Sequence, residues 1–319
     1  MKKLFLLLVL AVSSVFTKAQ DTITITTWNI EHLGSSGRGL GGIGKGNLPL
    51  RKSDDFKAIA SLIKTSLQSD IIALQEIALS DTTNGRESDQ LDSLVKYLGS
   101  DWKYVLGTRG AGDILGSQVH NMQNAFLWNS SKVHLIESFT MDFENIKIGK
   151  NAFDRHPLVG YFEAIKKGEE NQTDFLLVNV HLKSGQNNDE NHLGAMVIIE
   201  QNLKDYLKDH GIKESDKVIL GDFNDNPYDE RYFDLLYRYM EHRKYVDLVT
   251  EDLGATRMDD DLKSIIDHVL VNSSFKNEMV EVKAKRYFPT SDLAEWRKIY
   301  SDHFPISIEV KVRKDGDVD

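Results

Sequence analysis

The chain has 319 residues, of which 40% are hydrophobic and 28% are charged, a composition that suits a soluble globular protein with a sizeable core. It contains no cysteine, which excludes disulfide bridges, thiol nucleophiles and cysteine-ligated zinc. The formal net charge of −10 provides no general attraction to nucleic acid, so phosphate binding would need a local cationic patch or divalent cations held by carboxylates.

The first 19 residues have the pattern of an export signal. Lys2 and Lys3 precede an apolar run over 4–12 that is too short to span a bilayer, and Thr17 and Ala19 are the small residues expected before a cleavage site. We therefore expect cleavage near Ala19 and a secreted or periplasmic mature protein.

The remaining sequence favours a single domain over residues 20–313, followed by a charged tail over 314–319, because it contains no low-complexity linker and no detectable repeat. Apolar runs and alternation predict strands at 22–28, 70–74, 102–106, 124–128, 133–140, 158–165, 174–182, 218–220, 265–271 and 306–312. Apolar residues at helical spacing predict helices at 53–67, 87–98, 193–207 and 230–240. Strands separated by helices are typical of an α/β protein.

One loop is conspicuous in this order of elements. The glycine-rich stretch 34–46 follows the first strand but lacks the spacing and the Lys-Ser/Thr ending of a phosphate-binding P-loop. We expect it to be a mobile surface loop, with substrate contact as one option.

Polar side chains gather at the ends of the predicted strands. Asp222 and Asn224 follow the apolar run 218–220 and, being two residues apart, share one face of the chain. Asn29 and Glu31 repeat this pattern after the first strand. For the first pair taken alone, an Asx turn, in which the side chains cap their own backbone, is the slightly better explanation, so the interpretation depends on whether the pattern recurs.

The pattern recurs along the whole chain. Glu76 follows a wholly apolar strand, where a charge needs a partner or an opening into a site. His181 stands near a strand end, although a core histidine bonded to a backbone carbonyl would explain it equally well. Asp267 interrupts another apolar run, and Asp302 and His303 precede the last strand. Oxygen ligands favour Mg²⁺, Mn²⁺ or Ca²⁺, and two histidines suit acid–base catalysis, so these groups favour metal-assisted hydrolysis by water.

Six short motifs, in the same order, resemble those of the endonuclease/exonuclease/phosphatase superfamily, which has the deoxyribonuclease I-like fold. They are Trp28-Asn29-Ile30-Glu31, Leu74-Gln75-Glu76-Ile77, Val180-His181-Leu182-Lys183-Ser184, Leu220-Gly221-Asp222-Phe223-Asn224, Ile266-Asp267-His268 and Ser301-Asp302-His303. The resemblance covers the mature chain almost end to end. It implies an α/β (α+β) four-layer sandwich, in which two mixed β-sheets pack face to face with helices outside and the active site lies at one edge.

The resemblance also implies roles for individual residues. The metal ligands, for Mg²⁺ with Mn²⁺ or Ca²⁺ as alternatives, would be Glu76, Glu31, Asp302 and Asn29. The catalytic residues would be His181, Asp222, Asn224, Asp267 and His303. The residues contacting the substrate phosphate would be Asn29, Arg155 and Lys183. His303, oriented by Asp267, would act as general base and His181 as general acid, while Asp222 would polarise the nucleophile or assist the leaving group.

The sequence departs from the resembled pattern at one position. In the nuclease branch a glutamate before the 124–128 strand supports the general-acid histidine, whereas here Met122 or Gln123 stands at the corresponding place. Gln123 or Asn124 is therefore the candidate hydrogen-bond partner of His181.

The sequence thus predicts a secreted, divalent-metal-dependent phosphodiesterase that hydrolyses nucleic acid, with DNA favoured over RNA. We expect a monomer without stable membrane association. The alternative is a phosphoesterase of the same fold acting on a phospholipid headgroup or an inositol phosphate. A non-catalytic binding module is disfavoured because every metal and histidine position of the motifs is retained.

Overall fold

The computed structural model describes residues 22–34, 48, 50–78, 88–107, 122–141, 153, 155–165, 173–185, 189–228, 235–279, 283–290 and 292–313. The predicted export signal, the tail 314–319 and the glycine-rich stretch beyond Gly34 lie outside the described residues. No helix in the described ranges is both long enough and apolar enough to cross a membrane.

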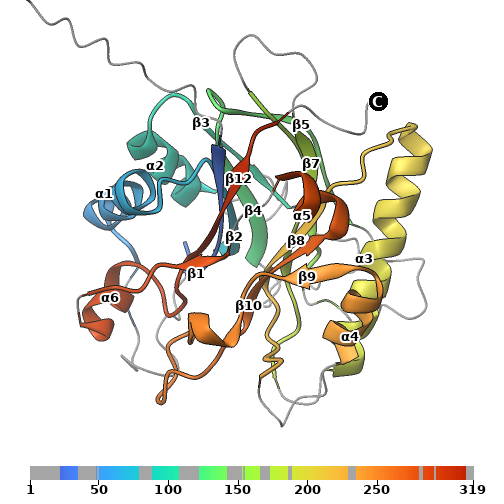
Figure 1. Cartoon of the computed structure of the whole chain (residues 1–319). Helices are drawn as coiled ribbons and strands as arrows, with labels where there is room; N and C mark the ends of the chain where they lie inside the picture. The colour runs from blue at the N-terminus through green and yellow to red at the C-terminus, as the bar shows by residue number, and fades with distance from the viewer. Residues whose placement is uncertain are drawn as a thin grey trace, which may run out of the picture.

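Two six-stranded sheets form the centre of the molecule (Figure 1). The first contains, in spatial order, β11 (Lys285–Arg286), β12 (Ile306–Lys311), β1 (Thr22–Leu33), β2 (Ile71–Ala78), β4 (Met122–Asn129) and β3 (Trp102–Leu106). The second contains β5 (Val133–Thr140), β6 (Leu158–Ala164), β7 (Asp174–His181), β8 (Lys217–Asp222), β10 (Asp267–Asn272) and β9 (Tyr245–Asp247). Both sheets mix parallel and antiparallel pairs, as predicted.

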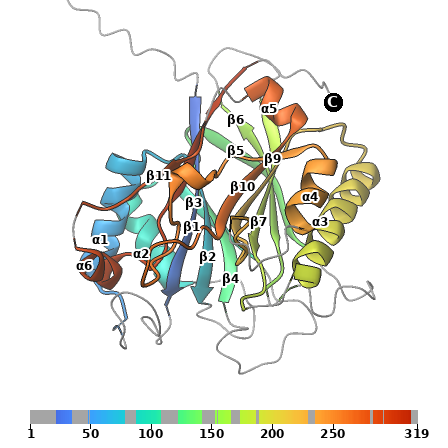
Figure 2. The same cartoon turned by 60° about the horizontal axis from the view of Figure 1, so that its bottom comes forward.

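Helices cover the outer face of each sheet (Figure 2). The first sheet is covered by α1 (Ser53–Leu62), α2 (Asp89–Leu98) and α6 (Leu293–Ile299), and the second by α3 (Asp189–His210) and α4 (Leu235–His242). A further short helix, α5 (Ser273–Met279), follows β10. The predicted four-layer sandwich is therefore confirmed.

Three separate apolar layers hold these four layers together. In β1 the side chains of Ile23 and Ile25 join the core between the sheets, whereas Trp28 and Ile30 pack beneath the helices of the first sheet. The third layer lies between the second sheet and α3 and α4. Fully burying one such side chain contributes about 2 kcal/mol, so these layers supply the main force that fixes the sheets against each other.

The two sheets repeat one topology that the sequence does not reveal. Along β12-β1-β2-β4-β3 the pairings run antiparallel, parallel, antiparallel, antiparallel, and β6-β7-β8-β10-β9 has the same succession. Each parallel pair is connected through a helix, α1 between β1 and β2 and α3 between β7 and β8. The carboxyl ends of both parallel pairs meet at one edge of the sandwich, where the polar motifs lie.

Most predicted elements are present, with shifted ends. The predicted helix 53–67 is an α-helix only to Leu62 and continues as a π-helical turn, Ile63–Leu67. The predicted strand 265–271 begins at Asp267, so Asp267 stands at the start of β10 and does not interrupt it. The short elements α5, α6, β9 and β11 were not predicted, because elements of two to seven residues depend on tertiary packing and carry little periodicity of their own.

Candidate active site

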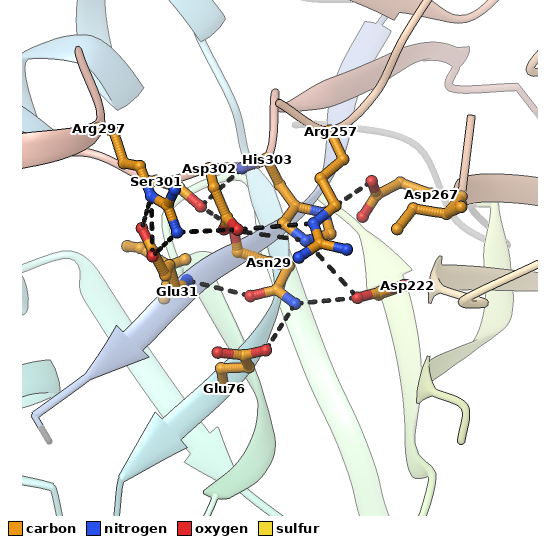
Figure 3. Close-up of polar contacts among 12 residues, drawn as sticks. Asn29, Glu31, Glu76, Asp222, Arg257, Asp267, Arg297, Ser301, Asp302 and His303 are labelled. Atoms are coloured by element: carbon orange, nitrogen blue, oxygen red, sulfur yellow. Dashed lines mark hydrogen bonds and ion pairs between the residues drawn. The ribbon is translucent and has the colours of Figure 1, made fainter. Parts of the chain in front are cut away.

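The candidate site lies where the parallel strand pairs of both sheets end (Figure 3). Polar residues at or near these ends are Asn29 on β1, Glu76 on β2, His181 on β7 and Asp222 on β8. Asp267, the first residue of β10, lies directly opposite Asp222 in the antiparallel register. The strand ends thus collect the groups that the sequence predicted as separate motifs.

The Ser-Asp-His motif enters from the segment before β12. The Ser301 hydroxyl donates to the carbonyl oxygen of Asn29 at 2.6 Å and accepts the backbone N–H of His303 at 3.0 Å. The Trp28 indole N–H donates to the His303 carbonyl at 3.2 Å. Ser301 therefore ties Asp302 and His303 to the end of β1, which explains why a serine precedes the pair.

Strained backbone accompanies the site. Four residues other than glycine have left-handed φ values here: Glu31 at 48°, His32 at 51°, Glu76 at 64° and Asn224 at 49°. The pairing of β1 with β2 is irregular over the same stretch, after Asn29. Each such conformation costs about 1–3 kcal/mol and tends to occur at functional sites. The distortion turns these side chains away from the regular pleat.

Asn29 is the central cross-link between the two sheets. Its buried Nδ2 donates to Glu76 Oε1 at 3.1 Å and to Asp222 Oδ2 at 3.0 Å, while its Oδ1 accepts the backbone N–H of Glu31 at 3.0 Å. In this arrangement the amide directs hydrogens toward two carboxylates. Asn29 thus lies between Glu76 and Asp222 and binds both through its amide N–H groups. Its side-chain oxygen points to the backbone of Glu31 and not into the space between the two carboxylates.

His303 and Asp267 form the pair that the sequence predicted. His303 Nδ1 lies 2.8 Å from Asp267 Oδ2, and Nε2 faces Asp222 Oδ2 at 3.8 Å and Asp302 Oδ1 at 3.9 Å. Burial alone would lower the pKa of His303, but the three carboxylates, Asp267 foremost, raise this pKa to about 10. The imidazole is therefore positively charged at neutral pH.

His181 has the opposite environment. Its Nε2 lies 3.5 Å from Asp222 Oδ2, 3.9 Å from Glu76 Oε1 and 3.3 Å from Arg155 Nη1. Burial, followed by the charge of Arg155, lowers the pKa of His181 well below its ordinary value. His181 is therefore neutral, and Arg155 lies beside it as the predicted phosphate contact.

The support expected for His181 is not seen at Asn124. The Asn124 Nδ2 donates to the carbonyls of His156 and Asn179, each at 3.2 Å. The buried Nδ1 of His181 has no hydrogen-bond partner in the described part of the chain. Neither Gln123 nor Asn124 therefore fixes, through a bond to Nδ1, which ring nitrogen of His181 carries the proton.

The two central carboxylates also have shifted pKa values. Burial, reinforced by Asp267, raises the pKa of Asp222 to about 6, although His303 opposes this shift. Burial acts in the same direction on Glu76, but the nearby charges of His32 and Arg155 outweigh it and lower the pKa of Glu76. Glu76 is therefore ionised at neutral pH, and Asp222 titrates close to neutrality.

Two of the predicted metal ligands are bound by arginine. The buried Arg297 contacts both oxygens of Glu31, with its Nε at 3.0 Å from Oε1 and its Nη2 at 2.6 Å from the same atom. Asp302 Oδ2 lies 3.4 Å from Arg297 Nη2 and 3.5 Å from Arg257 Nε. Glu31 thus belongs to a buried ion pair with Arg297 of α6 beside the site.

The donor set fits a hard divalent cation. Carboxylate oxygens of Asp222 and Asp267 lie within 4.8 Å of each other and of a nitrogen of His303, which is protonated and therefore does not itself act as a ligand. Asp267 Oδ1 is buried and has no hydrogen-bond partner among the described residues. Carboxylate oxygens are the preferred ligands of Mg²⁺, Mn²⁺ and Ca²⁺, and Glu76 adds a further carboxylate that contacts Asn29 and His32.

Two predicted site residues act through other contacts. Asn224 donates from Nδ2 to the Leu182 carbonyl at 3.0 Å, and its backbone N–H donates to Asp222 Oδ1 at 2.9 Å. The carbonyl of Lys183 lies 2.8 Å from His192 Nε2, and within the described ranges no contact joins the Lys183 ammonium to the other site residues. Asn224 therefore joins the loops after β7 and β8, and the phosphate contact of Lys183 stays a prediction.

Three residues of the site were not predicted from the sequence. His32 lies 3.3 Å from Glu76, Arg297 binds Glu31, and Arg257 reaches Asp302. His32 adjoins the first motif and could have been suspected from that position. Arg257 and Arg297 lie in irregular and short segments, and only long-range pairing brings them to the site.

The chain is similar to known proteins both in sequence and in fold. Residues 26–303 match the sequence model of the Endonuclease/Exonuclease/phosphatase family, whereas no curated protein sequence matches the chain. The fold is similar to that of an endonuclease/exonuclease/phosphatase from Bacteroides vulgatus, with a TM-score of 0.59 and 15% identity over 92% of this chain and 99% of that one. It is also similar to the sulfate-bound catalytic domain of human nocturnin (TM-score 0.56, 16% identity, 92% and 95% covered). A mannosyl-6-phosphatase from Bacteroides thetaiotaomicron has a TM-score of 0.53 and 15% identity, with 90% and 99% covered.

Proposed function

The chain belongs to the endonuclease/exonuclease/phosphatase family, and on that premise we propose that it is a divalent-metal-dependent phosphodiesterase that hydrolyses nucleic acid, with DNA favoured over RNA. Enzymes of this family hydrolyse phosphoester bonds with the help of a divalent metal. The observation that carries the proposal is the convergence of Asn29, His181 and His303 on one carboxylate oxygen of Asp222. Attack of water on phosphorus needs such groups because charge develops on the attacking and leaving oxygens.

We assign the metal, with Mg²⁺ ahead of Mn²⁺ and Ca²⁺, to the side of the site formed by Glu76. The contacts of Glu76 are an amide and a histidine, whereas Glu31 and Asp302 contact arginines. Mg²⁺ commonly takes only one or two protein carboxylates and completes its coordination with water and substrate phosphate. When bound, it would supply positive charge to the phosphoryl oxygens.

The pKa shifts suggest a division of the proton-transfer roles. Asp222, with a pKa of about 6, is suited to accept the proton of the attacking water near neutral pH. His303, with a pKa of about 10, already carries the proton that can stabilise or protonate the departing oxygen. His181 is neutral and would hydrogen-bond a phosphoryl oxygen beside Arg155. The water oxygen bonds to phosphorus, the ester P–O bond breaks, and the alcohol leaves with a proton from His303 or solvent.

A second candidate is a phosphoesterase of the same fold acting on a phospholipid headgroup, an inositol phosphate or another small phosphoester. The formal charge of −10 favours it, because the chain as a whole does not attract polyanions. The similarity to a mannosyl-6-phosphatase is consistent with it. For either substrate class, we propose an exported monomer that acts outside the cytoplasm, in line with the signal pattern over residues 1–19.

The test is hydrolysis by the mature protein of plasmid DNA, RNA, bis-p-nitrophenyl phosphate and sphingomyelin, with Mg²⁺ and with chelator. Metal-dependent nicking of plasmid DNA is the expected result. Turnover of the small diester or the lipid beside intact DNA and RNA would move the substrate to the second candidate. Inactivity on all four would contradict the proposed function.

The site assignment is tested by His181→Ala and His303→Ala. Each should lower kcat by about 10²–10⁴-fold, the usual contribution of a proton-transfer group, without changing the circular dichroism spectrum. His134→Ala is the control, because His134 lies on β5, is 62% exposed and pairs only weakly with Glu163 at 3.6 Å. Near-normal turnover by either active-site variant would show that the assigned site is wrong.

A further inference from the structure

Arg257 is brought to the site by backbone pairing. The residue forms an isolated antiparallel bridge with His303. On either side of this bridge, the N–H of Met258 donates to the Asp302 carbonyl at 2.7 Å and that of Phe304 donates to the Thr256 carbonyl at 2.8 Å. Residues directly opposite each other in an antiparallel pair extend their side chains on the same face. The Arg257 side chain therefore emerges beside the His303 imidazole.

The guanidinium of Arg257 forms one ion pair within the described part of the protein. Its Nε lies 3.5 Å from Asp302 Oδ2, and the side chain remains 41% exposed. Within the described part of the chain its buried Nε has no hydrogen-bond partner, and neither terminal nitrogen makes a hydrogen bond. In the view of Figure 3 the guanidinium overlaps the His303 ring, with Asp302 on one side and Asp222 on the other. The two terminal nitrogens are thus available to a ligand in the site.

The charge of Asp302 does not by itself explain why an arginine stands at position 257. The buried Arg297 already contacts Asp302 Oδ2 at 3.4 Å. Burial disfavours the charge of Arg257, but the carboxylates of Asp302, Asp222, Glu76 and Asp267 outweigh it and raise the pKa of Arg257, so this charge faces the whole site and not Asp302 alone. A guanidinium that only approaches a carboxylate, at 3.5 Å, and whose buried Nε makes no hydrogen bond among the described residues keeps its donors for an anionic ligand.

A second guanidinium lies on the other side of the site. Arg155 Nη1 is 3.3 Å from His181 Nε2, and its buried Nε has no hydrogen-bond partner in the described ranges. Arg155 therefore accompanies His181, and Arg257 accompanies His303. A phosphoryl group bound between the two histidines would have one arginine on each side.

We propose that Arg257 is a second phosphate-binding arginine of this site, and that it holds the additional negative charge of a terminal phosphoryl group. The inference rests on the proposed phosphoester hydrolysis and extends its substrate class to phosphomonoesters. A diester phosphate carries one negative charge, whereas a monoester phosphate carries nearly two at neutral pH. Arg257 should therefore matter more for monoesters than for diesters.

The test compares Arg257→Gln and Arg257→Lys with Arg243→Gln. Arg243 is the matched control, because it forms a similar ion pair, 3.3 Å from Glu200, and is 46% exposed, but lies just after α4. Binding of inorganic phosphate is measured by calorimetry with Mg²⁺ present. Kinetics are measured on p-nitrophenyl phosphate and bis-p-nitrophenyl phosphate, and thermal unfolding reports on the fold.

For Arg257→Gln we expect the Kd of phosphate to rise about tenfold or more, the loss expected for one hydrogen bond between charged groups. The kcat/KM on the monoester should fall by a similar factor, and that on the diester by less than about threefold. Arg257→Lys should fall between wild type and Arg257→Gln, and Arg243→Gln should match wild type.

Three results would overturn the proposal. These are a wild-type protein that does not bind phosphate, an Arg257→Gln variant whose phosphate Kd matches that of Arg243→Gln, and equal losses on the two esters. The last result would assign Arg257 to the Asp302 ion pair alone. If wild type hydrolysed neither ester but Arg257→Gln still weakened phosphate binding, the anion site would stand and the proposed function would fail separately.

Discussion

At the scale of single residues, the two histidines of the site show how neighbouring groups set protonation. His303 Nδ1 contacts a carboxylate, whereas His181 Nδ1 has no partner in the described part of the chain and its Nε2 faces a guanidinium. Both rings are buried, so desolvation acts on them alike. The difference in pKa therefore comes from the charge of the neighbours, which is a property of the folded chain.

This contrast can be measured directly. In the metal-free protein at pH 7.5, long-range ¹H–¹⁵N NMR should show His303 as imidazolium and His181 as neutral imidazole. Asp267→Asn should bring the pKa of His303 down toward its ordinary value, because Asp267 is the main carboxylate raising it. A wild-type His303 that titrates near pH 6.5 would contradict the assignment.

The raised pKa of His303 also makes the stability of the folded protein depend on pH. The folded pKa of His303, about 10, lies above the ordinary value of 6.5, so its contribution is fully present below pH 6.5 and is lost as pH rises through 10. The stability difference between wild type and Asp267→Asn, measured in urea with chelator, should therefore be larger at pH 6.5 than at pH 10. A difference that does not change with pH would exclude this linkage.

Glu31, a predicted metal ligand, forms a buried ion pair with Arg297, and its role as a ligand can be tested against that of Glu76. Removing one partner of a buried ion pair leaves an uncompensated charge, so Glu31→Gln should lower the free energy of unfolding by about 3–5 kcal/mol. The Kd of Mg²⁺, measured by calorimetry, should change less than threefold, whereas Glu76→Gln should raise it about tenfold or more. If both variants weakened metal binding equally, Glu31 would be a ligand after all.

At the scale of elements, a buried amide network joins the two sheets beneath the site. Gln75 Nε2 of β2 donates to Asn179 Oδ1 of β7 at 2.8 Å, and Asn179 Nδ2 donates to the carbonyls of Leu74 and Ala125, each at 2.9 Å. These residues lie one and two positions before Glu76 and His181. Buried polar groups need specific partners, so the network fixes the register in which the catalytic side chains meet.

The pairing of β7 with β8 depends on Gly221. Its φ of 145° is unfavourable for other residues, and an added Cβ would lie 2.0 Å from the carbonyl oxygen of Val180. Gly221→Ala should therefore lower the free energy of unfolding by about 3 kcal/mol or more and separate His181 from Asp222. The measurement is urea unfolding with activity recorded in parallel.

Gly99→Ala is a suitable control for that variant. Gly99 also has a positive φ, 116°, but an added Cβ would have no neighbour within 4 Å. Backbone strain alone should cost about 1–2 kcal/mol there, with kcat unchanged. Equal losses of stability at Gly221 and Gly99 would show that the clash with Val180 is relieved by small shifts.

At the scale of the whole molecule, carboxylates of both sheets meet at one edge of a chain that is already acidic. Positive charges of Arg155, Arg257, Arg297 and His303 offset much of this negative charge, and a bound divalent cation would offset more of it. A divalent metal that binds only the folded state stabilises it by about 2.7 kcal/mol when its concentration is 100 times its Kd.

Mg²⁺ at that excess should therefore raise Tm by about 4 °C relative to chelator, because a chain of this size has an unfolding entropy of about 0.6 kcal/mol/K. Differential scanning calorimetry measures the shift. Glu76→Gln should remove most of it, whereas Glu163→Gln, on an exposed ion pair of β6, should retain it. A Tm that is insensitive to Mg²⁺ in the wild type would argue against a metal site in the folded protein.

The sequence by itself determined the fold class, most strands and the chemical groups of the site. Local periodicity reports which face of a strand is buried, and a polar residue after an apolar run marks a strand end wherever that strand lies. The Asp267–His303 pair and the meeting of Glu76, His181 and Asp222 at one edge were implied by the resemblance of the six motifs to the family, and not by periodicity.

Only the tertiary structure decided how these groups are partnered. Arg297 reaches Glu31 across 266 positions of the chain, and Arg257 reaches the site through a single bridge with His303. Ion pairs of this kind leave no local periodicity, because they depend on which segments the sheets bring together. For the same reason the shared topology of the two sheets and the opposite protonation of the two histidines follow from packing and not from any stretch of sequence.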